Sequence, residues 1–345
     1  MSYLLNKNKT LLIAEVGQAH EGSFAMACSF IEAAAKNGAD AIKFQTHFAD
    51  EESSYLDEFR YKPLQIDDFS RLDYWRRMEF TDDQWKKLRD LAKKLGILFI
   101  SSPFSMKAFK LLKDLKIDCW KIASGEFFNF DLISNIVKTK KPIFLSTGMS
   151  TYEDISKLFS IFKFDKNNFC LMQCTSEYPC KPENLGFNVL KEYEERFKCL
   201  TGFSDHSGTI FPSLVAASYQ ACAVEVHVCF DKDIFGFDAS SSITFDELKI
   251  LSDGIKFINS SISKKVDKSK LSLNQKKLKK LFLKSAYLKK DVSAGDKISM
   301  KDIKFLKPAV GITHDDLDKY LKYPIRKSLK KDSPLEKKHF QIKKS

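Results

Sequence analysis

Long hydrophobic runs are missing from this 345-residue sequence, and no apolar stretch approaches the roughly 20 residues that a transmembrane helix requires. The first ten residues, MSYLLNKNKT, contain neither a long apolar segment nor a small-residue cleavage site, so no secretory signal peptide is recognised. We therefore expect a cytoplasmic protein without a membrane partner.

Metal-binding cysteine pairs are also missing. The eight cysteines are scattered along the chain without a Cys-x-x-Cys spacing, and Cys170 and Cys174, which share a strand face, do not complete a zinc site by themselves. We expect reduced, buried thiols.

Acidic residues are too few to balance the basic ones, which leaves a formal net charge of +12. Much of the excess is lysine in residues 270–290, and a lysine-rich stretch of this kind is typical of a solvated helix face or a linker. Nucleic acid is therefore not expected as a partner.

A Gly-x-Gly-x-x-Gly motif is absent after the first predicted strand, which argues against a doubly wound open sheet. The first 265 residues alternate apolar strands with amphipathic helices, and the first helix is predicted to begin after an N-cap Ser23 and to stop at Gly38. Eight such units over about 250 residues are typical of an α/β fold of the (β/α)8 or TIM barrel type. The strands are predicted at residues 11–16, 41–46, 98–103, 119–124, 142–147, 169–175, 199–204 and 223–230.

The pattern changes after residue 265. Residues 1–265 are predicted to form the catalytic barrel, and residues 266–283 a polar linker with helical content. Residues 284–345 contain short alternating runs and an Ala-Gly-Asp turn, which predict a separate small β-rich domain.

Polar side chains occupy inward positions of the predicted barrel strands. Alternate side chains of a barrel strand point inward, and the inward ones here include Glu15, Lys43, Gln45, Lys121, Glu225 and His227. Further polar residues fall at or just past the strand ends, namely Ser124, Ser146, Tyr178, Asp205 and His206. Each alone could be a satisfied core residue, half of an ion pair or a helix cap. Together they indicate a site, because buried unpaired charges are costly and the C-terminal rim of such barrels carries the catalytic groups.

The residue types narrow the chemistry of this site. Two lysines beside serine hydroxyls suit a phosphate or a carboxylate. His206 and His227, with Glu15 or Asp205 nearby, could hold a divalent metal, and nitrogen ligands suit Mn, Co, Zn or Fe better than Mg. The residues therefore predict a barrel enzyme that polarises a carbonyl with a metal beside a bound phosphate.

A series of motifs resembles the sialic acid synthase family, the phosphoenolpyruvate-dependent synthases of nonulosonic acids. The motifs are IAEVGQAHEGS (13–23), GADAIKFQT (38–46), SSPFS (101–105), KIASGE (121–126), LSTGMST (145–151), QCTSEYPC (173–180), GFSDHSGT (202–209), EVHVCF (225–230) and FGFDASSS (235–242). The tail, with YLKKDVSAGDKI followed by KPAVGI (307–312), is similar to the family's antifreeze-like (SAF) domain. The match covers nearly the whole chain.

The resemblance implies a metal-dependent, aldol-like condensation. C3 of phosphoenolpyruvate attacks the aldehyde of an open-chain N-acylated hexosamine, such as N-acetylmannosamine or a modified relative, and phosphate leaves by C–O cleavage. The metal-binding histidines of the family fall on His206 and His227, with manganese as the first choice of ion and cobalt or magnesium as alternatives. A homodimer is also implied, in which the small domain of one subunit caps the barrel of its partner.

The resemblance also implies roles for the other residues. The predicted catalytic residues are Glu15, Lys121, Glu225 and Asp238. The predicted substrate-binding residues are Lys43, Gln45, Ser124, Ser146, Tyr178 and Lys307. Among these, the positions that bind phosphoenolpyruvate are Lys43, Lys121, Ser124, Ser146 and Tyr178.

Several positions depart from the family pattern. The usual Asn-His after the first strand reads Ala19-His20, and an Asn of the strand-six motif reads Ser176. The usual Arg-Pro-Gly turn of the capping domain carries Lys307, which cannot reproduce the bidentate fork of arginine. A sugar-binding Asn is not found in residues 50–81. The phosphoenolpyruvate half of the site thus matches the family, whereas the sugar half is altered.

Two other functions remain open from the sequence. A Schiff-base aldolase would use Lys43 or Lys121 as its nucleophile and would need no metal. A non-catalytic carbohydrate-binding relative would explain the altered sugar half.

Overall fold

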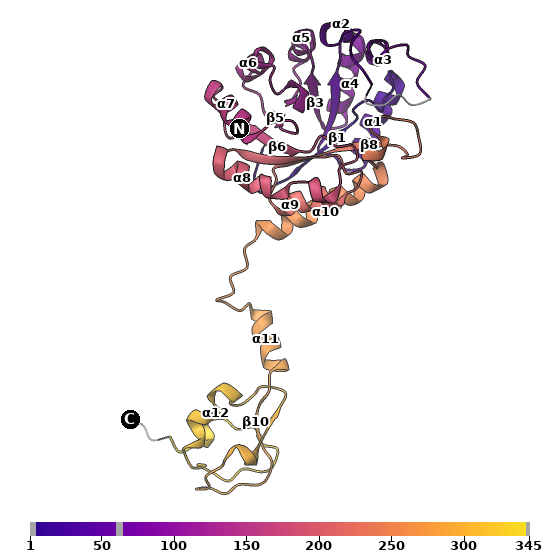
Figure 1. Ribbon diagram of the computed structural model, residues 1–345. Coiled ribbons are helices and arrows are strands. Elements are labelled where there is room, and N and C mark those ends of the chain that lie inside the picture. Colours follow the sequence, from indigo (N-terminus) through magenta and orange to yellow (C-terminus); the bar gives the residue numbers. More distant parts are fainter. Residues whose placement is uncertain (1–4, 60–64, 343–345) are drawn as a thin grey trace. The chain divides into compact units, whose positions relative to one another are not determined.

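The computed structural model describes residues 5–59 and 65–342. The chain divides into two compact units, Met1–Lys264 and Lys265–Ser345 (Figure 1). Among the described residues, we find no helix with the length and apolar character needed to cross a membrane.

The larger unit contains a closed barrel of eight parallel strands. Each strand pairs with the next along the chain, and β1 pairs with β8 to close the barrel. The strands are β1 (Leu11–Glu15), β2 (Ala41–Thr46), β3 (Leu98–Pro103), β4 (Cys119–Ile122), β5 (Ile143–Ser146), β6 (Phe169–Cys174), β7 (Leu200–Asp205) and β8 (Ala223–Cys229). A short strand, β9 (Ser242–Thr244), adds to β8. The predicted (β/α)8 barrel is confirmed, and each predicted strand agrees within two residues at either end.

Helices surround this barrel (Figure 1). They are α1 (Phe24–Lys36), α4 (Asp82–Lys94), α5 (Met106–Asp114), α6 (Phe130–Lys138), α7 (Tyr152–Ile161), α8 (Phe187–Phe197), α9 (Phe211–Ser218) and α10 (Phe245–Ser263). As predicted, Ser23 caps α1 by accepting a hydrogen bond from the Met26 N–H, and Gly38 follows the helix end with a φ of +86°.

The strand side chains alternate between two apolar layers. Ile42, Phe44 and Trp120 belong to the larger cluster, which packs between the strands and the helices. A smaller cluster, which includes Ile13 and Phe144, fills the barrel interior. The polar inward-facing residues lie beyond this smaller cluster, at the carboxyl ends of the strands.

Two short helices interrupt the usual pattern after β2. α2 (Ala49–Glu52) and α3 (Arg71–Met78) precede α4, so this βα connection is much longer than the others. Tyr74 and Trp75 of α3 belong to a separate small apolar cluster. Glu52 of α2 and Arg71 and Trp75 of α3 line a cavity at this end of the barrel.

The smaller unit contains an antiparallel pair of strands, β10 (Ser285–Leu288) and β11 (Ile303–Leu306), and the helix α12 (His314–Leu321). Its core is a cluster of its own that includes Leu288, Ile303 and Leu317. The segment predicted as a linker contains α11 (Leu273–Phe282), none of whose residues is buried.

Candidate active site

The strand register brings three of the predicted residues to one level. β1 lies between β2 and β8, and Glu15 is paired in register with Lys43 on one side and His227 on the other. Since all three positions lie near the carboxyl ends of parallel strands, their side chains meet at the rim of the barrel.

A buried network of ion pairs joins four predicted residues. Lys43 Nζ lies 2.7 Å from Glu15 Oε1 and 3.3 Å from Glu225 Oε1. Lys121 Nζ lies 3.2 Å from the same Glu225 oxygen. All four side chains are at most 4% exposed, so the two ammonium groups and the two carboxylates compensate one another out of contact with water.

The pKa values of this network follow from the pairing. Burial alone would lower the pKa of Lys43, but the carboxylates of Glu15 and Glu225 outweigh it and raise that pKa above its ordinary value. Burial alone would raise the pKa of Glu225, but Lys121 and Lys43 outweigh it and lower that pKa. Both groups therefore stay charged at neutral pH.

The two predicted metal-binding histidines lie side by side. The ring centroids of His206 and His227 are 5.4 Å apart with an interplanar angle of 56°, and each residue is 5% exposed. His206 Nδ1 donates to the Thr175 carbonyl oxygen at 2.8 Å, because a carbonyl can only accept, and this leaves the lone pair on Nε2. Burial, with a smaller effect of His227, lowers the pKa of His206 to about 3, so its ring is neutral at neutral pH.

Gly17 leaves space beside His227 that a larger residue would fill. Its φ is +54°, and a Cβ there would lie 3.1 Å from two atoms of the His227 ring and 3.2 Å from Asp238 Oδ2. His227 Nδ1 lies 3.7 Å from that oxygen, and this buried nitrogen has no hydrogen-bond partner among the described residues. A buried imidazole nitrogen of His227 without a partner, beside the neutral ring of His206, fits a transition-metal ion.

Other carboxylates of the predicted site are already engaged in hydrogen bonds or ion pairs. Asp205 accepts from the Ser207 N–H and the Ser213 hydroxyl, and Glu15 is engaged with Lys43 and Gln45. Within residues 5–59 and 65–342, no cluster of three or more His, Cys, Asp or Glu side chains is arranged to hold a metal.

The predicted serines do not cap helices. Ser124 Oγ accepts from the Gly148 N–H at 3.0 Å, and Ser146 Oγ is buried without a hydrogen-bond partner in the described part of the chain. The N-caps of α6 and α7 are instead Asn129 and Thr151. The helix-cap interpretation of the two serines is therefore wrong.

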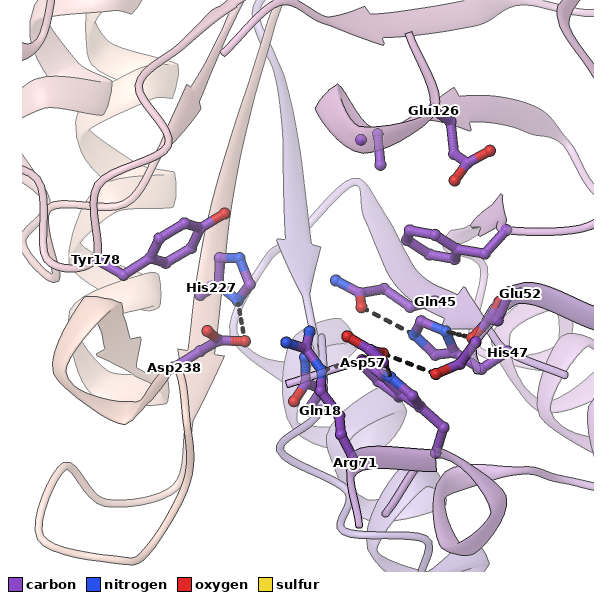
Figure 2. A pocket seen from close by; sticks show the side chains of 15 residues that line it. Gln18, Gln45, His47, Glu52, Asp57, Arg71, Glu126, Tyr178, His227 and Asp238 are labelled. Atoms are coloured by element: carbon purple, nitrogen blue, oxygen red, sulfur yellow. Dashed lines mark hydrogen bonds and ion pairs between the residues drawn. The ribbon is translucent and has the colours of Figure 1, made fainter. Parts of the chain in front are cut away.

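A cavity of about 340 Å³ opens above the rim (Figure 2). Four predicted residues line it, namely Gln45, Tyr178, His227 and Asp238. The Tyr178 ring stacks on His206 with centroids 4.1 Å apart. Lys307 lies in the smaller unit, with Nζ 5.4 Å from the centroid of the Phe282 ring.

Both units match known protein families. The sequence model of the NeuB family matches residues 30–267, and that of the SAF domain matches residues 284–341. The chain belongs to the NeuB family. As a NeuB-family protein it is 32% identical over 331 residues to the N,N'-diacetyllegionaminic acid synthase of Campylobacter jejuni, covering 94% of this chain and 98% of that protein.

Other relatives are also synthases of nonulosonic acids. A pseudaminic acid synthase of Campylobacter jejuni is 33% identical over 308 residues, covering 88% of this chain and 89% of that protein. The crystal structure of N-acetylneuraminic acid synthetase from Leptospira borgpetersenii aligns with a TM-score of 0.68 at 25% identity, covering 79% of this chain and 91% of that chain. The resemblance to the sialic acid synthases and the antifreeze-like domain is thereby confirmed.

Several cavity residues of this NeuB-family chain were missed from the sequence. They are Gln18, His47, Glu52, Asp57, Arg71, Trp75, Phe104 and Glu126. The strand-end rule used for His206 applies equally to His47, which follows β2 directly, and could have found it. Arg71 and Trp75 come from the extra helix α3, and no strand end marks their positions.

Proposed function

We propose that the protein condenses phosphoenolpyruvate with an open-chain N-acylated hexosamine to give a nonulosonic acid and inorganic phosphate. A bond forms between C3 of phosphoenolpyruvate and the aldehyde carbon, water adds at C2, and the C2–O bond to phosphate breaks. We further propose a cytoplasmic homodimer in which the SAF domain of one subunit caps the barrel of the other. The observation that carries the proposal is the buried network of Lys43, Lys121, Glu15 and Glu225 at the same rim as the paired imidazoles.

Phosphoenolpyruvate is assigned to the side of the site with the two lysines. Lys43 and Lys121 supply ammonium groups, and Ser124, Ser146 and Tyr178 supply hydroxyls for its carboxylate and phosphate oxygens. The buried, unsatisfied hydroxyl of Ser146 supports this assignment, because a buried polar group without a partner is costly unless a ligand provides one.

His206 and His227 would hold the divalent ion, with manganese as the first candidate. When bound, the ion supplies Lewis-acid polarisation of the aldehyde oxygen. Glu15, Glu225 and Asp238 are carboxylates within the same rim and are assigned to holding sugar hydroxyls and moving protons.

The Schiff-base alternative is not favoured by the environment of Lys43. A nucleophilic lysine must be uncharged, and the pKa of Lys43 is instead raised by its two carboxylate partners, which together outweigh burial. Loss of activity on chelation and the absence of a borohydride-trapped lysine adduct would support the metal-dependent reaction over this alternative.

A sugar-panel assay tests the proposed function. The protein is incubated with phosphoenolpyruvate, manganese and each of several N-acylated hexosamines, including N-acetylmannosamine and di-N-acetylated relatives. We expect phosphate release that depends on one class of sugar, with a product whose mass is that of sugar plus phosphoenolpyruvate plus water minus phosphoric acid. Phosphate release no greater than in the sugar-free reaction, for every sugar, would contradict the condensation and favour a carbohydrate-binding role.

The Lys307→Arg substitution tests the assignment of the capping domain to the sugar. Arginine offers a bidentate fork where lysine offers a point charge, so we expect a change in the ratio of kcat/KM between two sugars of the panel. The KM for phosphoenolpyruvate should stay within about twofold, because the lysine pair and the serines bind that substrate. Steady-state kinetics on both sugars measure this. A changed KM for phosphoenolpyruvate with an unchanged ratio of kcat/KM between the two sugars would mean that the assignment of Lys307 to the sugar is wrong.

A further inference from the structure

His47 is a buried histidine in the cavity wall to which the sequence assigned no role. Its ring is stacked between Trp75 and Phe104, with centroid distances of 4.2 Å and 4.5 Å and interplanar angles of 26° and 18°. The residue is 6% exposed. Both faces of the ring are thus packed, and only its edge can make polar contacts.

Both ring nitrogens of His47 have side-chain partners (Figure 2). Nε2 lies 3.1 Å from Gln45 Oε1, and Nδ1 lies 2.5 Å from Glu52 Oε1. The Glu52 side chain is 9% exposed. The contacts therefore form a chain, from Glu52 through His47 to Gln45, that ends beside the reacting groups at the rim.

The direction of each hydrogen bond in this chain can be assigned. Glu15 Oε1 lies 2.7 Å from Lys43 Nζ, so Glu15 is a carboxylate and can only accept. Gln45 Nε2 must then be the donor in its 3.0 Å contact with Glu15 Oε1. This places Gln45 Oε1 toward the imidazole, so His47 Nε2 must carry a proton and donate it.

The remaining proton lies between His47 Nδ1 and Glu52. If His47 Nδ1 carries it, the pair is an imidazolium and a carboxylate, and if Glu52 carries it, the pair is neutral. In either state the 2.5 Å hydrogen bond fixes the ring edge, and in either state Nε2 donates to Gln45. The orientation of the Gln45 amide therefore does not depend on the charge of the pair.

We propose that His47, held by Glu52, is a positioning residue that fixes the amide of Gln45 for the acceptor sugar. One N–H of Gln45 Nε2 is used by Glu15, and the second is left to donate to an oxygen of the sugar in the cavity. This inference rests on the proposed function. It adds to the site a segment outside the strands, since His47 and Glu52 follow β2 and Trp75 comes from α3.

The test is His47→Phe, which keeps an aromatic ring between Trp75 and Phe104 but removes both nitrogens. We expect kcat/KM for the best sugar of the panel to fall by about 10- to 100-fold, since a misplacement near 1 Å has effects of this order. The KM for phosphoenolpyruvate should stay within about twofold. His47→Gln, whose amide nitrogen can reach the position of Nε2, should restore part of the loss.

A double-mutant cycle separates positioning from a general structural effect. If His47 acts through Gln45, adding His47→Phe to Gln45→Ala should cause little further loss, whereas independent sites would show additive effects. Glu52→Leu should lower kcat/KM in the same direction, and the matched Glu51→Leu, on the exposed side of the same short helix, should not.

The possible results distinguish a failure of the proposed role of His47 from a failure of the proposed condensation reaction. Additive effects in the cycle, or equal losses for both substrates, would overturn the role of His47 while leaving the condensation intact. If the unchanged protein releases no phosphate with any sugar, the proposed function fails, and the inference fails with it. Thermal unfolding of each variant identifies a loss that comes from misfolding, and His47→Gln and Glu52→Leu then decide the question.

Discussion

Turnover is expected to be abolished in both His206→Ala and His227→Ala. Each substitution removes one of two neighbouring imidazoles, and no third His, Cys, Asp or Glu in the described part of the chain completes a ligand cluster that could compensate. We expect at least about a thousandfold lower rate of phosphate release across a manganese titration, because an ion left with a single protein ligand is neither retained nor oriented.

Metal content provides a second readout for these two variants. Elemental analysis after gel filtration should show substoichiometric manganese in both, while circular dichroism should show the barrel unchanged. Near-normal rates in both variants would place the metal elsewhere in the protein. Normal metal content with lost activity would instead assign the histidines to direct contact with substrate.

Glu225→Ala is expected to cost about 3–5 kcal/mol in the free energy of unfolding, the range typical of removing one partner from a buried ion pair. Glu225 Oε1 contacts the ammonium groups of both Lys43 and Lys121, so the substitution leaves Lys121 without its carboxylate and Lys43 with Glu15 alone. Denaturant unfolding monitored by tryptophan fluorescence measures the loss.

A surface pair supplies the matched control for this prediction. Lys191 and Glu195 form an exposed pair one helical turn apart, at 3.6 Å, and Glu195→Ala should leave the unfolding free energy nearly unchanged. A small effect of Glu225→Ala would mean that the two lysines lose their charge or find other partners. The loss of unfolding free energy in Glu225→Gln should lie between the losses in Glu225→Ala and Glu195→Ala, since glutamine keeps the shape of the side chain but not its charge.

The barrel was predictable because its strands and helices repeat a regular pattern. The alternation within AIKFQT places Ile42 and Phe44 under the helices and Lys43 at the interior, and the structure agrees. The same two-residue period brought the four members of the ion-pair network to one rim. Local patterns of this kind depend on the chain alone, so the sequence contains them.

The cavity wall could not be predicted in the same way. The position of His47 depends on stacking against Trp75 and Phe104, which are distant in the sequence and meet only in the folded chain.

For Ser124 and Ser146, by contrast, a local pattern gave a wrong interpretation. Their position before a helix suggested capping, but the chain first makes a 3-10 turn after Ser124 and a further turn after Ser146, so the caps fall at Asn129 and Thr151.

The absence of a side chain at Gly17 has a consequence for how far this rim can vary. One added methyl group would press on the His227 ring and on the Asp238 carboxylate at the same time, and the left-handed backbone at this position would add strain of its own. A substitution at a residue that has no side chain of its own would therefore displace two polar groups together. The tolerance of the rim to mutation is set as much by this empty space as by the groups around it.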